Sequence, residues 1–261
     1  MNNLIDWKEY IDYIYCMNYM PDNRINNISS TLQNIGIDIY DNRFFSFIYD
    51  CEHKMFLDEY DLMRKKSFKF YDEHKFYESE NLYCNENFDY VFDVALTTYK
   101  VLKTAQYFNY KRIIIFEDDV VFLKDLKYIK NAMDFVKTQD FDICLCQTTF
   151  VDAWYGNKEY LVNFGCEEFG NDMFLKTNRP SGVFGGAFII LTNEGINKII
   201  NYFEENNFIM CLDALGDLSH LIKLTTLFAL KPLCVQKRFG DWSHEQIINC
   251  NININNINEY I

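Results

Sequence analysis

The stretch Arg-Ile-Ile-Ile-Phe-Glu-Asp-Asp-Val-Val-Phe-Leu, residues 112–123, decides the fold. Apolar residues, mostly β-branched or aromatic, lie on both sides of three acids, which is typical of a strand buried on both faces. Neighbouring carboxylates repel one another and are costly to bury, so they favour a bound cation. We therefore expect Glu117, Asp118 and Asp119 at the carboxyl end of a central strand, in a crevice that holds a divalent metal and a ligand.

The direction of the three acids follows from the pleat of an extended backbone. Side chains alternate along a strand, so Glu117 and Asp119 are expected to point one way and Asp118 the other. The plainer alternative is an acidic turn at the end of a strand, without a ligand. The apolar runs on both sides favour the metal interpretation, because surface acids rarely lie between two such runs.

Composition bounds the class of protein. The chain of 261 residues is 49% hydrophobic and 18% aromatic, enough for the core of one large domain. Its net charge of −13 argues against a nucleic-acid partner, and an anionic ligand would need a metal ion or a nearby cation. The nine cysteines are scattered without a Cys-x-x-Cys pair, so we expect reduced buried thiols rather than a zinc site.

Membrane and export signals are not evident in the sequence. No apolar run approaches the roughly 20 residues of a membrane span, and residues 1–8 lack the apolar core of a signal peptide. Together with the reduced thiols, this predicts a cytoplasmic protein without a transmembrane segment, in which any contact with a membrane would be peripheral. No pattern predicts the oligomeric state.

Hydrophobic periodicity predicts alternating strands and helices, as in an α/β protein with a parallel sheet. Strands are expected at 10–17, 37–40, 112–116, 141–146, 183–191 and 231–236. Helices are expected to begin at the caps Asp22, Asp93, Asp125, Asn193 and Asp213, the first of them ending at Gly36. Residues 150–182 are expected to be a long binding loop. Residues 41–90 show no firm period, and the 246–261 tail is undecided between helix, edge strand and frayed end.

Separated segments of the chain, taken together, match one family pattern. The first segment is Ile14-Tyr15-Cys16-Met17 with Arg24, and the second is Ala95-Leu96-Thr97-Thr98 with residues 112–121. The third is Gly185-Gly186-Ala187-Phe188-Ile189-Ile190 with Gly195, and the last block holds Asp213, Pro232, Gln236 and Ser243. In order and spacing these segments resemble the family 25 glycosyltransferases, which include lipooligosaccharide and procollagen galactosyltransferases. The match spans about residues 11–244 and departs at Thr98, usually His, and Met17, usually Leu.

The resemblance implies a fold and a reaction. The fold would be a single GT-A domain, a Rossmann-like mostly parallel sheet with flanking helices. Its nucleotide-sugar half would cover about 1–125, its acceptor half about 126–245, and the Asn/Ile-rich tail 246–261. The reaction would transfer a hexose, galactose or glucose, from a UDP-sugar to a hydroxyl of a glycan or protein acceptor, with Mn²⁺ or Mg²⁺ and with inversion. The donor sugar, the acceptor and the linkage stay open.

The metal ligands and the catalytic base can be named as hypotheses. Hard carboxylate oxygens suit Mn²⁺ or Mg²⁺, so Glu117 and Asp119 are the metal candidates. His244 is expected as the third ligand, with Asp241 next, although a surface histidine is an equal alternative. Inversion needs a carboxylate to take the acceptor proton, and the resemblance places Asp213 in that role. The alternative for Asp213 is a plain helix cap. Weaker candidates for the base are Asp217 and Glu194.

A second set of residues is expected to contact the donor. Asp118 would reach its ribose or sugar, and glycines at 185 and 186 would let the backbone approach closely, unless they mark a bulge. Arg24 would offset a phosphate or pair with an acid on its own helix. Met17 ends the first strand, where a base could lie, and it is equally a core residue. The full predicted donor set is Asp118, Arg24, Met17, Thr98, Gly185 and Gly186, with Trp154, Tyr155 and Trp242 as stacking candidates.

A sugar transferase is one of several functions that such a fold can carry. A catalytically inactive GT-A-like protein that keeps the fold for binding or scaffolding is the main alternative, because of Thr98 and the divergent 41–90 region. A metal-dependent phosphotransferase would need a Gly-Lys phosphate loop or an aspartyl nucleophile motif, and neither is present. A nucleotidyltransferase would need a glycine-rich basic loop after the first strand, and residues 18–24 contain no glycine.

Overall fold

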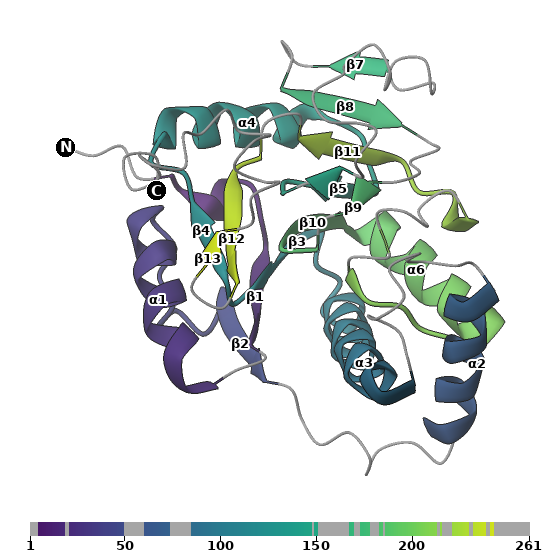
Figure 1. Ribbon diagram of the computed structural model, residues 1–261. Coiled ribbons are helices and arrows are strands. Elements are labelled where there is room, and N and C mark those ends of the chain that lie inside the picture. The colour runs from purple at the N-terminus through teal and green to yellow at the C-terminus, as the bar shows by residue number, and fades with distance from the viewer. Residues whose placement is uncertain are drawn as a thin grey trace.

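The computed structural model describes residues 5–18, 21–49, 60–73, 85–147, 149–150, 167–169, 173–177, 183–184, 186–212, 215, 221–229, 232–238 and 241–242. Its helices and strands are shown in Figure 1. In chain order they are η1 (Trp7–Glu9), β1 (Tyr13–Asn18), α1 (Pro21–Asn34), β2 (Phe45–Tyr49), α2 (Tyr60–Glu73), α3 (Asn85–Tyr107), β3 (Arg112–Glu117), β4 (Val120–Phe122), α4 (Leu126–Thr138), β5 (Ile143–Leu145), β6 (Thr149–Phe150), β7 (Glu167–Phe169), β8 (Phe174–Thr177), β9 (Val183–Phe184), β10 (Phe188–Thr192), α6 (Asn193–Asn206), β11 (Thr226–Ala229), β12 (Cys234–Arg238) and β13 (Asp241–Trp242).

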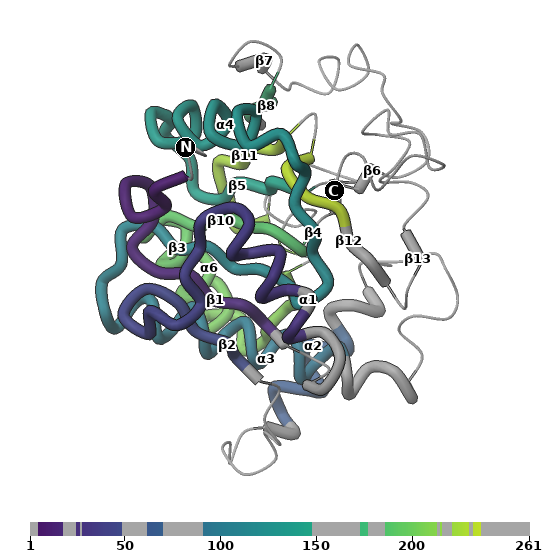
Figure 2. Tube along the Cα trace, turned by 90° about the vertical axis from the view of Figure 1, so that its left-hand side faces the viewer, coloured from purple at the N-terminus to yellow at the C-terminus, as the bar shows by residue number. Residues whose placement is uncertain are grey.

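Among these residues, eight strands form one sheet in the order β2-β1-β3-β10-β5-β11-β8-β7. Figure 2 shows this order from β2 at the bottom to β8 near the top. The strands β1, β2, β5, β11 and β7 run in the direction of β3, whereas β10 and β8 run against it. The sheet is therefore mostly parallel, as predicted, with a reversed strand, β10, next to its centre.

Residues 112–117 form the central strand β3, and this strand is buried on both faces as predicted. Ile113 and Ile115 pack into the cluster that contains α3 and α6. Ile114 and Phe116 pack into the cluster that contains α1 and α4. The molecule therefore has three layers, with α1 and α4 on one face of the sheet and α3 and α6 on the other (Figure 1). The fold is α/β and compatible with a Rossmann-like GT-A fold.

Local capping explains where several helices begin and end. Asp125 caps α4, because its side chain accepts a hydrogen bond from the Tyr128 amide at 2.9 Å, as predicted. The first helix, α1, ends at Asn34 and is terminated by Gly36, which has a φ of 90°. There the Gly36 amide donates to Gln33 O and the Ile37 amide to Leu32 O, the paired bonds of a glycine-terminated helix.

Several predicted elements are displaced or wrong. The strand expected at 37–40 is absent from the described residues, and β2 begins at Phe45. The side chains of Asp38 and Asp41 accept backbone amides two residues later, which stabilises turns in place of a strand. The helix expected to begin at Asp93 begins at Asn85. The cap of α6 is Thr192 and not Asn193.

Two further predictions concern the second half of the chain. Residues 150–182 were expected to be loop, but β7 and β8 lie within them and extend the main sheet. The strand expected at 183–191 is divided into β9 and β10, with the two glycines between them. The helix expected after Asp213 and the 246–261 tail lie outside the described residues.

The chain leaves the main sheet directly after the three acids. β3 ends at Glu117, residues 118–119 form a turn, and β4 begins at Val120 in a second sheet with the order β13-β12-β4. β12, which was predicted as a core strand at 231–236, pairs with β4 in this second sheet instead of joining the main one. The acids therefore mark the junction of two sheets.

Candidate functional site

The acids lie where the sequence predicted them, at the carboxyl end of the central strand. Glu117 is the last residue of β3, and its amide donates to Ala187 O at 3.0 Å. Asp118 and Asp119 follow in the turn and are only 1% and 6% exposed. Because these two residues lie in a turn, the strict alternation of direction expected for an extended backbone does not apply to them. Two buried carboxylates and one half-buried carboxylate thus lie side by side at a sheet junction.

The end of β1 lies beside the three acids, because Met17 pairs with Glu117. The Cys16 thiol is fully buried on β1, opposite Phe116. Burial raises the pKa of this thiol well above its usual value, and the negative charges of Asp118, Asp119 and Glu117 raise it further. Cys16 therefore stays a neutral thiol, and it is a neighbour of the acids that the sequence patterns did not indicate.

Three of the predicted donor-binding residues lie near the carboxyl end of β3, as the acids do. Met17 pairs with Glu117 in the register of β1 and β3. Thr98 on α3 is fully buried, with its hydroxyl 3.9 Å from the Met17 sulfur and 3.0 Å from Val94 O, to which it donates. Gly186 is buried just before β10, next to the residue whose carbonyl binds the Glu117 amide. Their contact with a donor stays a prediction.

A hairpin from near the end of the chain reaches the acids as well. β12 runs antiparallel to β4, and Gln236 lies opposite Val120, the residue that follows Asp119. β12 continues to Arg238 and returns as β13, where Asp241 pairs with Arg238. Asp241, the second choice for a third ligand, is thus carried by a hairpin that begins beside the acid turn.

The remaining predicted residues divide into two groups. Glu194 is wrong as a candidate base. Glu194 lies two residues after Thr192, and Thr192 pairs with Arg112 at the amino end of β3. Arg112 is five residues, or roughly 16 Å along the strand, from Glu117. Glu194 also forms an ion pair with Lys198. Arg24 lies within α1. The structure describes Trp242 only as part of β13. Residues outside the described part of the chain are Trp154, Tyr155, Gly185, Asp213, Asp217 and His244.

The described residues do not form a complete metal site, because no three His, Cys, Asp or Glu side chains among them are placed to hold one ion. The donors present at the acid turn are nevertheless of the right chemistry, because carboxylate oxygens suit Mg²⁺ and Mn²⁺. Such ions are commonly held by one or two carboxylates together with substrate phosphates and water. Glu117 and Asp119 fit that partial role.

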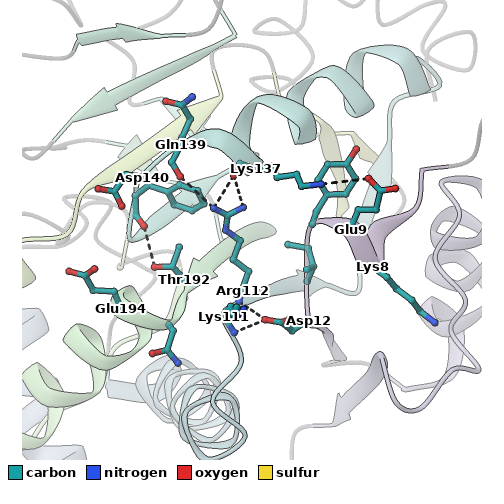
Figure 3. A pocket seen from close by; sticks show the side chains of 14 residues that line it. Lys8, Glu9, Asp12, Lys111, Arg112, Lys137, Gln139, Asp140, Thr192 and Glu194 are labelled. Carbon is teal, nitrogen blue, oxygen red and sulfur yellow. Dashed lines mark hydrogen bonds and ion pairs between the residues drawn. The ribbon is translucent and has the colours of Figure 1, made fainter.

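A pocket lies at the amino end of β3, and the polar groups in it have a structural role. This hollow of about 470 Å³ surrounds Arg112, as Figure 3 shows. The Arg112 guanidinium donates to Lys137 O and Gln139 O at 3.3–3.4 Å and so caps the carboxyl end of α4. The Asp12 carboxylate accepts the amides of Lys111 and Arg112 and fixes the start of β3. These polar groups hold the fold together, far from the acid turn.

Comparisons with known proteins give only distant likenesses. No family model matches the chain, and no curated protein matches it. A crystal structure of A197 from STIV is similar over 88% of this chain and 86% of that chain, with 12% identity and a TM-score of 0.40. Mouse xyloside xylosyltransferase 1, in its apo form, is similar over 80% of each chain, with 9% identity and a TM-score of 0.34. Likenesses of this size carry no activity over to this chain.

None of the helices in the described part of the chain has both the length and the apolar character that crossing a membrane requires.

Proposed function

We propose that the chain is a metal-dependent glycosyltransferase that moves a hexose from a UDP-sugar to a hydroxyl of a glycan or protein, with inversion. The observation that carries the proposal is the acid turn, in which Asp118 and Asp119 are buried next to Glu117 at the carboxyl end of a central strand. Ligands of open α/β sheets bind outside the carboxyl ends of the strands. The sequence resemblance to family 25 glycosyltransferases supports the same site.

The acid turn suits a nucleotide diphosphate only with a cation present. A net charge of −13 and three adjacent carboxylates repel a diphosphate. Glu117 and Asp119 would hold Mn²⁺ or Mg²⁺, with His244 or Asp241 as a third ligand. The bound ion would neutralise the diphosphate as it leaves the sugar.

The other residues would bind the donor and move one proton. Asp118 would accept hydrogen bonds from the donor ribose or sugar, and the backbone at 185–186 would let a sugar ring approach closely. The Asp213 carboxylate would take the proton of the acceptor hydroxyl while that oxygen attacks the anomeric carbon from the face opposite the diphosphate. The bond from the anomeric carbon to the diphosphate oxygen breaks, and the carbon is inverted.

Binding of UDP tests the metal site. We expect UDP to bind in the presence of MnCl₂ and not in the presence of EDTA, measured by titration calorimetry. Asp119→Asn keeps the shape of the side chain and removes its charge, so Mn²⁺-dependent UDP binding should weaken more than about tenfold. The matched control is Asp140→Asn, an exposed acid in the pocket at the amino end of β3. Equal UDP binding with and without Mn²⁺, or unchanged binding by Asp119→Asn, would contradict the proposal.

Transfer tests the base. Asp213→Asn is expected to bind UDP-galactose or UDP-glucose as the unmodified chain does and to lose transfer to the acceptor by at least about a hundredfold, the scale of general base catalysis. The measurement is release of UDP with a panel of glycan and peptide acceptors. Turnover retained by Asp213→Asn would assign the base to another carboxylate.

A catalytically inactive binding protein is the second candidate, and one observation favours it. Thr98, one of the predicted donor residues, is fully buried and gives its hydroxyl to Val94 O of its own helix. This arrangement is that of a packing residue. Mn²⁺-dependent UDP-sugar binding without transfer or donor hydrolysis would identify the chain as a binding protein that keeps the donor site.

A further inference from the structure

A second hollow lies on the α3 face of the sheet, between the edge strand β2, the start of β1 and the carboxyl-terminal half of α3. Its volume is about 430 Å³, within the range of small-molecule pockets, about 300–1,000 Å³. Its lining is Tyr13, Tyr15, Asn42, Arg43, Ser46, Ile48, Lys100, Val101, Thr104, Phe108 and Tyr110. None of these residues belongs to the acid turn.

A ladder of aromatic rings forms one wall of the hollow. Tyr110 stacks on Tyr13 with centroids 5.3 Å apart and on Phe108 with centroids 5.6 Å apart. Tyr13 in turn contacts Tyr15 at 4.8 Å. Phe108 also meets the exposed Tyr107 ring edge-on at 5.2 Å, and it is itself 57% exposed, although burying such a ring normally stabilises a fold. The ladder therefore presents an aromatic surface to a ligand in the hollow.

The charge of the hollow is opposite to that of the whole chain. Arg43 and Lys100 line it, and none of the described lining residues is an acid, in a chain with a net charge of −13. The nearest carboxylate on the same loop, Asp41, accepts Lys8 Nζ at 2.7 Å as well as Arg43 Nε at 3.4 Å. The two terminal nitrogens of Arg43 make no hydrogen bond to any described residue, and 88% of this side chain is exposed. A guanidinium in that state can bind a carboxylate with two parallel bonds.

Neutral hydrogen-bonding groups complete the lining. The side chains of Asn42 and Ser46 make no hydrogen bond within the described part of the chain. Thr104 donates to Lys100 O at 2.8 Å and keeps lone pairs to accept with. Aromatic faces next to amide and hydroxyl groups suit a sugar ring, since the ring face carries C–H bonds and its rim carries hydroxyls.

We propose that this hollow binds an acidic saccharide, one whose pyranose ring carries a carboxylate. The ring would lie against Phe108, its hydroxyls would bond to Asn42 and Ser46, and its carboxylate would pair with Arg43. A nucleic-acid strand also stacks on aromatic rings, but the net charge of the chain opposes a polyphosphate.

The aromatic ladder is separate from the acid turn. Tyr13 pairs with Ile113, and Met17 pairs with Glu117, so the ladder begins four residues or roughly 13 Å from the acids along the strands. At the other end of the hollow, Ile48 of β2 pairs with Met17, which leaves β1 between the hollow and Glu117. The inference therefore goes beyond the proposed function, because saccharide binding here needs neither Mn²⁺ nor a nucleotide.

The test is titration calorimetry with a tetrasaccharide of alternating glucuronate and N-acetylglucosamine, in EDTA. We expect saturable binding that weakens as NaCl rises from 50 to 500 mM, since an exposed ion pair is screened by salt. Phe108→Ala should weaken binding by roughly tenfold, the scale of one lost aromatic contact. Arg43→Gln should weaken it by about threefold, the scale of one exposed ion pair.

Two matched variants separate the site from a general surface effect. Tyr40 is 80% exposed and does not line the hollow, so Tyr40→Ala should bind as the unmodified chain does. Lys111→Gln removes an exposed cation that also lies outside the lining and should have no effect. All four side chains are at least partly exposed, so their circular dichroism and unfolding temperatures should agree, which shows that the variants fold.

Three results would overturn the proposal. The first is the absence of binding at millimolar tetrasaccharide, and the second is equal binding of the neutral N-acetylglucosamine tetramer. The third is sedimentation with vesicles that contain phosphatidylserine, lost equally in Tyr107→Ala and Phe108→Ala. That last result would identify the aromatic pair as a membrane contact.

Discussion

At the scale of single residues, Gly195 is needed for a close approach between α6 and β5. A Cβ atom at this position would overlap the carbonyl oxygen of Asp142. The same backbone carbonyl accepts the Thr192 amide, and the Asp142 side chain binds Lys198 and the Thr225 amide. The contact is between two backbones, so no side-chain rotation can relieve it.

We therefore expect Gly195→Ala to lower the free energy of unfolding by roughly 1–3 kcal/mol, the usual cost of overpacking. Urea denaturation followed by circular dichroism measures the change. The control is Glu194→Ala at the neighbouring exposed position, which should stay within about 0.5 kcal/mol of the unmodified chain. An unchanged urea midpoint in Gly195→Ala would show that α6 can shift without cost.

Sequence reasoning located the acids but not all of their surroundings. Glu117, Asp118 and Asp119 could be placed because acids between two apolar runs are a local pattern. Cys16 could not be placed beside them, since that neighbourhood depends on the register of two strands a hundred residues apart. The same holds for Gln236, which lies opposite Val120 only because of strand pairing.

At the scale of elements, α6 is joined to α3 by Glu204. Its carboxylate binds Lys103 Nζ at 2.9 Å and the Tyr99 hydroxyl at 2.8 Å. The bond from Lys103, followed by that from Tyr99, lowers the pKa of Glu204 below its ordinary value of 4.5. A lowered carboxyl pKa stabilises the fold fully above the unfolded value and stops doing so as the pH falls through the folded value.

Glu204→Gln should therefore destabilise the fold at pH 7 by less than about 1 kcal/mol, because the pair is half exposed. The difference between variant and unmodified chain should shrink at pH 3, measured as free energies of unfolding in urea. Glu205→Gln is the matched control, since Glu205 is exposed and forms no ion pair with any described residue. A difference that stays constant with pH would mean that packing, and not charge, carries the effect.

Elements with strong local signals were predicted well. The runs at 112–116 and 141–146 were predicted as strands, and the helix after Asp125 was predicted from its cap and periodicity. The strand at 37–40 was wrong, because two aspartate turns outcompete a short apolar run there. The reversed direction of β10 was not predicted, since an apolar strand has the same pattern whichever way it runs.

At the scale of the whole molecule, stability should rise from the edges of the sheet to its centre. β3 and β10 are covered on both faces and paired on both sides, whereas β2 is an edge strand in the described sheet. Native-state hydrogen exchange should therefore give the amides at 113–116 and 188–191 the free energy of global unfolding. The amides of β2 at 46–48 should exchange through smaller openings. Equal protection of β2 and β3 would contradict this order.

The position of the reversed strand β10 in the chain also determines when the sheet can be completed during translation. β1, β2 and β3 come from the first 117 residues, but the strand that joins them to β5 and β11 ends only at Thr192. Most of the polypeptide must therefore have emerged from the ribosome before β10 can pair with β3 and β5 and join the two groups of parallel strands. Until then the nascent chain exposes the flank of β3, and chaperone binding during translation should concentrate on that interval.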